Sequence, residues 1–282
     1  MKIIGFLGVF TLTLVGQERL VMSGVSGHAV RPKVLSSSMK TAKIQGKDAA
    51  VFSLVTEEET TKILFDATQG KNSYFAELVS GDDIIPLAAI ALDKFEGHNE
   101  PPLKMILEVL GTDVNPGGTE LRLDTKENEI GDSVLAPSFE PVAGKSFRIQ
   151  GLARFSPPGI TPFGFVLPDG ELQEIGSLDT VSEKTPDTHQ CLLPPTLPTT
   201  EGIIVENPPK HFGLFLKARH YTSVTKPGAA KGAKIKHTAR VYPVKQLLGR
   251  DLENAFLVCF EEASNGDYQD AVFLIEGVKI SN

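Results

Sequence analysis

The final thirty residues contain the segment whose side chains are best suited to chemistry. Two apolar runs, 257–260 and 271–275, flank a short turn that carries four carboxylates and two amides. Alternate residues of an extended or tightly turning segment point to one side, so their oxygens can converge. The oxygen-bearing side chains of this turn are Glu261, Glu262, Asn265, Asp267, Gln269 and Asp270.

Two interpretations fit this spacing. Calcium takes about six to eight oxygen ligands in a loose geometry, whereas magnesium demands fewer protein ligands and a strict octahedron. Crowded carboxylates repel one another unless a cation or hydrogen bonds offset the repulsion. The alternative is a polar turn bonded to itself, because Asn265-Gly266 is a common hairpin pair and turns favour Asp and Asn. The spacing alone leaves both open.

The same segment resembles the end of a bacterial domain family of unknown function, found in secreted and surface proteins. That family ends in Phe-Glu-Asp followed by Gly-Asp-x-Asp-Tyr-Asn-Asp-x-Val-Phe. This chain has Phe260-Glu-Glu262 and then Gly266-Asp-Tyr-Gln-Asp-Ala-Val-Phe273, and upstream His211-Phe-Gly-Leu-Phe-Leu216 resembles the family's Phe-Gly-Phe-x-Leu strand. The resemblance covers Val205 to Gly277.

The resemblance implies a β-sandwich-like surface domain that binds calcium and performs no catalysis. Glu262 stands where the family has Asp, Gln269 where it has Asn, and Asn265 at an acidic position. Each change keeps an oxygen donor, but the lost negative charge lowers the expected affinity for a cation. The residues that match the family by position are Glu261, Asp267, Asp270 and Tyr268.

Composition excludes some classes of protein. The chain has 282 residues, of which 41% are hydrophobic, so it can build a core. A net charge of −7 argues against nucleic-acid binding, which needs a basic surface. The absence of Trp weakens, without excluding, a carbohydrate-binding platform. There is no Gly-x-Ser-x-Gly, phosphate-binding loop or His-Glu-x-x-His motif, so we expect no catalysis.

Turn signals recur about every ten residues and separate runs rich in β-branched and aromatic residues. Examples are the hairpins expected over 49–67 and 74–92, whereas 103–110 fits a strand or one short helix. The pattern predicts a mainly β protein, an antiparallel β-sandwich or jelly-roll-like fold with two β domains. The expected divisions are a linker over 30–45, an N-terminal β domain over 46–140 and a C-terminal β domain over 141–282 with a Pro-rich connection at 186–209.

The start of the chain predicts export. Lys2 precedes an apolar stretch from Ile3 to Gly16, which suits a signal peptide over 1–29 and is short for a membrane span. The alternatives are a buried first strand and an uncleaved anchor. We therefore expect a secreted, periplasmic or cell-surface protein with no stable membrane span after cleavage. Cys191 and Cys259 allow one disulfide, but the sequence does not show that they meet.

These observations favour an exported, non-catalytic β protein with a calcium-stabilised C-terminal hairpin, serving adhesion, assembly or ligand binding. Its partner would be a surface polysaccharide or another protein; the basic segment over 226–245 suits an anionic polymer or simply a solvated loop. A glycan-binding module is the first alternative, and a hydrolase with two carboxylates in a cleft is the second. The glycan module would need exposed aromatic side chains such as Tyr74, Phe163, Tyr221 or Tyr242.

Overall fold

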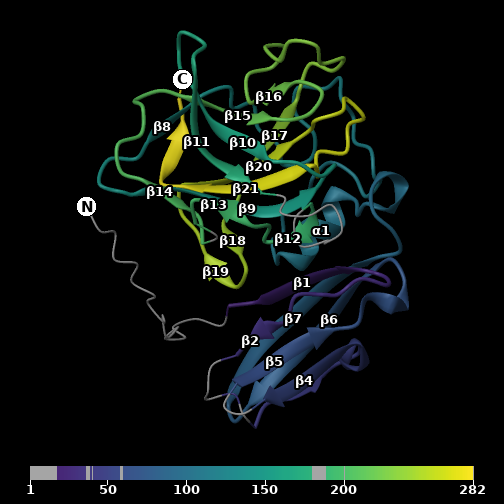
Figure 1. Cartoon of the computed structure of the whole chain (residues 1–282). Helices are drawn as coiled ribbons and strands as arrows, with labels where there is room; N and C mark the ends of the chain where they lie inside the picture. Colours follow the sequence, from purple (N-terminus) through teal and green to yellow (C-terminus); the bar gives the residue numbers. More distant parts are fainter. Residues whose placement is uncertain are drawn as a thin grey trace, which may run out of the picture.

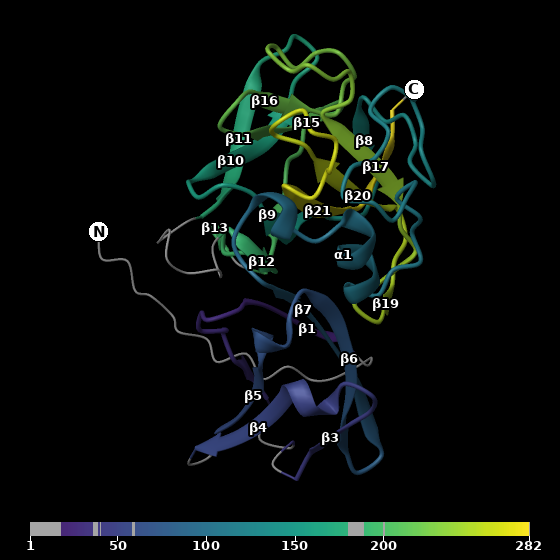
Figure 2. The same cartoon turned by 90° about the vertical axis from the view of Figure 1, so that its right-hand side faces the viewer.

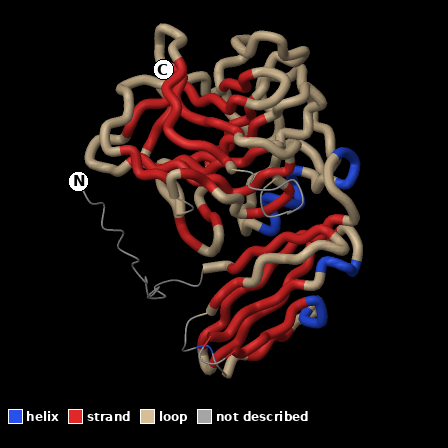
Figure 3. Tube along the Cα trace, viewed as in Figure 1, coloured by secondary structure: helices blue, strands red, loops and turns tan. Residues whose placement is uncertain are grey.

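The chain folds into two groups of β-sheets, one stacked on the other (Figure 1). The computed structural model describes residues 18–35, 39, 41–57, 60–179, 189–199 and 201–281. It is mainly β, with 44% strand and 7% helix, which confirms the predicted fold class (Figure 3). Within the described ranges no helix has the length and apolar character needed to cross a bilayer.

The N-terminal group is a pair of sheets packed face to face. The first has the order β1 (Leu20–Val25), β7 (Asp83–Leu92), β6 (Asn72–Ser80), β3 (Lys43–Gln45); the second has the order β2 (Lys33–Val34), β5 (Thr60–Phe65), β4 (Phe52–Glu57). The β4–β5 and β6–β7 pairs are antiparallel, as the hairpins expected over 49–67 and 74–92 predict, and β1 joins β7 in parallel. Short 3-10 turns cover Ala49–Val51, Ala67–Gln69 and Gly97–Asn99.

Strand β7 is apolar on both faces, and the two faces enter different cores. Successive side chains of a strand point to opposite sides of the sheet. Leu87 and Ala89 pack into the core between the two N-terminal sheets. Ala88 and Ile90 face the other way, into a core shared with the C-terminal group. A strand with two buried faces therefore joins the two halves of the molecule.

The C-terminal group is a sandwich of two larger sheets. One follows the order β12 (Gln190–Leu192), β9 (Phe147–Phe155), β21 (Ala271–Glu276), β20 (Ala255–Phe260), β17 (Ala239–Pro243), with β14 (Ile203–Val205) also on β9. The other follows the order β13 (Thr196–Leu197), β11 (Leu172–Leu178), β10 (Thr161–Val166), β15 (Gly213–Lys217), β16 (Thr222–Val224). Two small pairs add β8 (Phe139–Pro141) with β22 (Val278–Ile280) and β18 (Gln246–Leu247) with β19 (Arg250–Asp251).

Phenylalanine fills the core of this sandwich. Phe163 of β10 packs on Phe273 of β21 with ring centroids 4.7 Å apart, and Phe165 packs on Phe212 at 4.6 Å. Strands β10 and β15 are antiparallel neighbours in one sheet. Aromatic pairs at this spacing contribute beyond the area they bury.

The helix α1 (Leu103–Val109) covers the shared core, at the side of the upper group that faces the lower one (Figures 1 and 2). Leu103, Ile106, Leu107 and Leu110 are buried, the spacing of one helical face. That periodicity decides between the two structures expected for 103–110. By contrast, 119–122 forms bends, and the Leu123 N–H donates to Gly266 O at 2.7 Å.

The contacts revise the expected division of the chain. Strand β1 lies inside the segment predicted as a signal peptide over 1–29, so cleavage near Ser23 or Ala29 would split or remove a buried strand. Residues 1–17, which hold most of that prediction, lie outside the described residues. The expected linker 30–45 contributes β2 and β3. Residues before 140 also join the C-terminal group, because Val134 bridges Val241 of β17.

The two cysteines do not form a disulfide. Cys191 on β12 and Cys259 on β20 are buried thiols. Their strands are separated by β9 and β21 in the sheet order. Neighbouring strands lie about 4.8 Å apart, so strands three positions apart exceed the reach of a disulfide.

Candidate functional site

The six oxygen-bearing residues predicted from the sequence all lie in the connection between β20 and β21. The antiparallel register of these strands ends at the pair Phe260 and Ala271, which holds the ends of the connection side by side. Asn265 is half-buried, and the other five are almost fully buried, with 0–4% of their surface exposed. Ionisable side chains are rarely buried unless they are paired or coordinate a metal. These six residues, which the structure holds in one short connection with five of them buried, are hereafter the hairpin site.

Glu261 organises the loop. Its Oε1 accepts the backbone N–H groups of Ala263 at 2.8 Å and Asn265 at 3.3 Å. Its Oε2 accepts those of Gly266 at 2.7 Å and Asp267 at 2.9 Å. Hydrogen bonds to a charged acceptor are stronger than neutral ones. Glu261 therefore behaves as the second interpretation predicts, as part of a polar turn held by hydrogen bonds within itself.

Gly266 makes this tight loop sterically feasible. Its φ of 85° lies in the left-handed region that favours glycine. A Cβ at this position would lie 2.6 Å from Thr125 Cγ2 and 3.1 Å from Leu123 O. The loop is consequently held against the 119–125 segment, which covers the hairpin site on that side.

Three carboxylates converge at the centre of the hairpin site. Glu261, Asp267 and Asp270 each present one oxygen, and these three oxygens lie within 4.8 Å of one another. Asp270 Oδ2 also accepts the Glu262 N–H at 2.6 Å, and Asp267 Oδ2 accepts Asn265 Nδ2 at 2.6 Å. The backbone and the Asn265 amide therefore neutralise only part of the negative charge.

Several oxygens of the hairpin site are buried without a hydrogen bond. Within the described chain, no donor reaches Asp267 Oδ1, Glu262 Oε1, Gln269 Oε1 or Asn265 Oδ1. A buried acceptor without a partner costs about 1–3 kcal/mol, and more if it is charged. Four such atoms in one connection, beside three converging carboxylates, form a set of donors that suits a hard cation.

Burial shifts the protonation of these acids. It raises the pKa of Asp267 to about 8, assisted by the Glu261 charge, and the pKa of Asp270 well above its usual value, assisted by Asp267. Burial also raises the pKa of Glu262 to about 7, while the Arg154 charge opposes that shift. A bound cation favours the ionised form of its ligands and so opposes all three shifts.

Sequence reasoning missed a seventh polar residue, Glu100. Its Oε2 accepts Gln269 Nε2 at 3.2 Å and its Oε1 accepts Gln190 Nε2 at 3.1 Å. Burial raises the pKa of Glu100 to about 7, although the hydrogen bond from Gln190 opposes this. Glu100 lies 169 residues before Gln269 in an ordinary polar stretch, so no local pattern distinguishes it.

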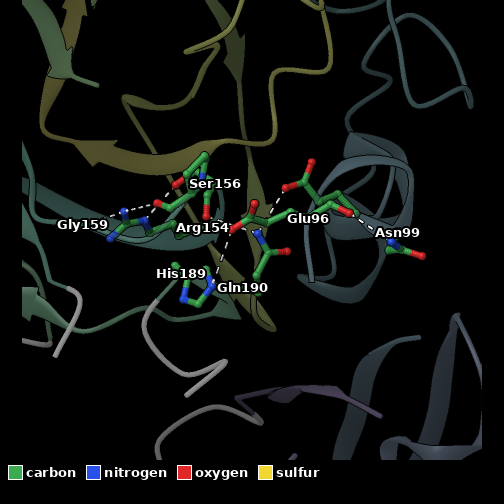
Figure 4. Close-up of polar contacts among 9 residues, drawn as sticks. Glu96, Asn99, Arg154, Ser156, Gly159, His189 and Gln190 are labelled. Atoms are coloured by element: carbon green, nitrogen blue, oxygen red, sulfur yellow. Dashed lines mark hydrogen bonds and ion pairs between the residues drawn. The ribbon is translucent and has the colours of Figure 1, made fainter. Parts of the chain in front are cut away.

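A buried arginine, Arg154, lies near Gln190 and His189 (Figure 4), and the charges of Glu262 and Asp270 act on it. Arg154 is 1% exposed, and its Nε donates to Ser156 Oγ at 2.9 Å. Its Nη2 donates to Pro157 O at 3.0 Å and to Gly159 O at 2.8 Å. The guanidinium is therefore engaged in holding the turn between β9 and β10.

The histidine beside this arginine is buried and neutral at neutral pH. His189 stacks on Phe95 with centroids 5.2 Å apart, and burial together with the Arg154 charge lowers the pKa of His189 to about 4. Glu96 Oε1 lies 4.0 Å from its Nε2. At neutral pH this imidazole cannot act as a general acid.

The structure gives little support to either alternative function. The aromatic residues considered for a glycan platform, Tyr74, Phe163, Tyr221 and Tyr242, are buried, with 0–8% exposure. Two surface depressions, of about 360 and 570 Å³, lie around Ala67 and around Glu253, and no residue of the hairpin site lines either one. A glycosidase needs its two carboxylates in an accessible cleft.

The basic segment 226–245 is partly structural. Arg240 is buried, and it donates to the carbonyls of Asp124, Glu127 and Asn128 at 2.9 Å each. Lys236 Nζ donates to Asn128 Oδ1 at 2.9 Å. These contacts anchor the 124–128 turn, so the segment does not present all its charge to a partner.

The burial of His237 makes the stability of the fold depend on pH in the acid range. The side chain is 3% exposed, and burial, with the charges of Arg240 and Lys236, lowers the pKa of His237 to about 4. Between pH 6.5 and 4 the unfolded chain therefore binds more protons than the folded chain does. The stability that the neutral His237 contributes to the fold is present in full above pH 6.5 and is lost as pH falls through that window. We expect urea unfolding to show that, between pH 7 and 4.5, the unfolding free energy of His237→Gln falls by about 2 kcal/mol less than that of the wild type.

The exposed His98 provides the control for this measurement. His98→Gln makes the same substitution at an exposed position, outside the buried core around His237. The difference between variants isolates the histidine from the buried carboxyls, whose raised pKa values act in the opposite direction. Equal slopes for wild type and His237→Gln would contradict the assignment.

Comparisons with protein families, with curated proteins and with solved structures found no match to this chain. The chemistry of the hairpin site is therefore argued from its own geometry.

Proposed function

We propose that the hairpin site binds calcium and that the ion stabilises a non-catalytic, exported β protein that serves adhesion, assembly or ligand binding. The observation that carries the proposal is the convergence of Glu261, Asp267 and Asp270 beside buried oxygens that accept no hydrogen bond from any described residue. The donors are carboxylate and amide oxygens, which hard cations prefer.

Calcium suits these donors better than magnesium does. The carboxylates and amides come from one irregular loop, and a flexible set of six to eight oxygens is the arrangement that calcium accepts. Magnesium retains several waters in a strict octahedron, and a site this deeply buried leaves little room for them. The missing carboxylate at Asn265 makes the site weaker than a fully acidic one, in the range of extracellular calcium modules.

Export and surface partners remain part of this proposal. They rest on the apolar start of the chain and on the resemblance of 205–277 to a surface domain family. An exported protein meets calcium at concentrations that fill a weak site. A surface polysaccharide or another protein is the proposed partner.

Calorimetry of the whole chain tests the calcium claim. After treatment with a chelator, 10 mM calcium, which is about 10–100 times a Kd of about 10⁻³–10⁻⁴ M, should raise the unfolding free energy by about 1.4–2.7 kcal/mol, which amounts to roughly 3–10 °C in Tm. Asp267→Asn and Asp270→Asn should abolish the rise, since each removes a central ligand charge. The matched control is Asp251→Asn, on the exposed surface of β19.

The same titration with magnesium should give a much smaller shift. Titration calorimetry on the wild type should show one calcium bound per chain. An unchanged wild-type Tm at millimolar calcium, together with no heat of binding, would remove the metal from the proposal.

A further inference from the structure

Glu100 occupies a position where three parts of the fold meet. It lies in the connection between β7 of the N-terminal group and α1, in the described region where the two groups share a core. Glu100 is only 6% exposed. An acidic side chain so deeply buried needs partners that stabilise its charge, and each of its partners belongs to a different structural element.

The first partner belongs to the hairpin site. Gln269 donates its Nε2 to Glu100 Oε2, and Gln269 Oε1 is one of the buried oxygens that accept no hydrogen bond from a described residue. An amide whose NH₂ group is held by a carboxylate turns its oxygen to the opposite side. Glu100 therefore fixes the direction in which Gln269 presents its oxygen, as outer partners of metal ligands do.

The second partner belongs to the strand next to the N-terminal group. Gln190 of β12 donates its Nε2 to Glu100 Oε1 and to Ser156 O at 3.2 Å. Two residues further along β12, the Leu192 N–H donates to Ser23 Oγ of β1 at 2.8 Å. The same carboxylate is thus connected to the contact between the two sheet groups.

The backbone of Glu100 completes the connection. Lys71, directly before β6, donates its Nζ to Glu100 O at 2.6 Å and to His98 O at 2.8 Å. Its backbone N–H donates to Asp93 Oδ1 at 3.0 Å. One lysine therefore ties both ends of the 93–100 segment to the N-terminal sheet.

We propose that Glu100 is a positioning residue that couples occupancy of the hairpin site to the junction between the two sheet groups, so that bound calcium orders the 93–102 connection. The inference rests on the proposed calcium site. A cation bound to Gln269 Oε1 fixes that amide, and the NH₂ group of the amide then fixes the Glu100 carboxylate. Glu100 in turn fixes Gln190 through its carboxylate, and its backbone carbonyl belongs to the segment that Lys71 binds. Calcium would then act on the docking of the two groups as well as on the hairpin.

The coupling has two readouts in the full chain. Hydrogen exchange of 93–102 should slow about tenfold or more when 10 mM calcium is added to the wild type. In titration calorimetry, Glu100→Gln should raise the Kd for calcium by about 10–100-fold. Glu108→Gln is the matched control, because this α1 carboxylate has a side chain 48% exposed and pairs with Lys104 on the same helix. It should keep the wild-type Kd.

A thermodynamic cycle separates positioning from general stability. If Glu100 acts through Gln269, Glu100→Gln should raise Kd no further in a Gln269→Met background. A merely structural role would give the same loss in both backgrounds. Should Glu100→Gln fail to fold, the exchange of 93–102 is compared in the wild type and in Gln269→Met, each at a calcium concentration that titration calorimetry shows to saturate it; only the wild type should respond.

The outcomes distinguish this inference from the calcium site itself. If calcium binds the wild type but leaves the exchange of 93–102 unchanged, or if Glu100→Gln binds it equally well, the coupling is overturned and the site stands. If the wild type binds no calcium, both are overturned.

Discussion

Glu261→Gln is expected to destabilise the protein by about 3 kcal/mol or more, with calcium present and with it removed. The carboxylate accepts four backbone N–H groups of the loop, and hydrogen bonds to a charged acceptor contribute about 1.5–3 kcal/mol each without adding fully. An amide at this position would direct its own NH₂ group at two of those donors. Urea unfolding followed by circular dichroism measures the loss.

This variant separates the two roles of the hairpin site. Asp267→Asn should lower stability chiefly in calcium, because Asp267 supplies a ligand charge, whereas Glu261→Gln should lower it in both conditions. Glu253→Gln is the control, since its ion pair with Lys145 at 2.9 Å is exposed and contributes little. A Glu261→Gln protein within 1 kcal/mol of the wild type would show that the loop does not depend on these hydrogen bonds.

Arg154→Met is expected to cost about 3–5 kcal/mol. The substitution keeps much of the volume but leaves the carbonyls of Pro157 and Gly159 and the hydroxyls of Ser156 and Thr161 without their donor. Removing one partner of a buried polar network leaves the others desolvated. Thermal and urea unfolding both measure the change.

Two further variants sharpen this test. Arg154→Lys should recover only part of the loss, because an ammonium has three donors and cannot reproduce the planar fork of the guanidinium. Arg148→Met is the control, since that side chain is 30% exposed and its ion pair with Glu276 is long, at 3.5 Å. Equal losses at positions 148 and 154 would contradict the role assigned to the buried guanidinium.

The parts of the fold that local pattern controls were predictable. The short apolar run from Ile84 to Leu92, which follows a turn signal, predicts a strand, and the structure has β7 there with both faces buried. The acidic turn was predictable as a cluster for the same reason. Its residues lie within ten positions of one another, so an antiparallel pair of strands brings them together whatever the rest of the chain does.

Patterns with two structural solutions were not predictable. The segment 1–29 is expected as a signal peptide, but its part from Leu20 to Val25 forms the buried strand β1, while the apolar stretch from Ile3 to Gly16 lies outside the described residues. Residues 103–110 suited a strand or a helix, and burial of one helical face against the shared core selected α1. In both cases a distant surface supplied the deciding contact.

By itself, the sequence determined a mainly β chain and the six oxygen-bearing residues between 261 and 270, because both follow from residue type and short spacing. Only the tertiary structure decided that five of these residues are buried, that four backbone N–H groups surround Glu261, and that Glu100 accepts hydrogen bonds from both Gln190 and Gln269. The reason is physical: burial and long-range hydrogen bonds depend on how sheets stack, and no local spacing records which distant segment will cover a turn.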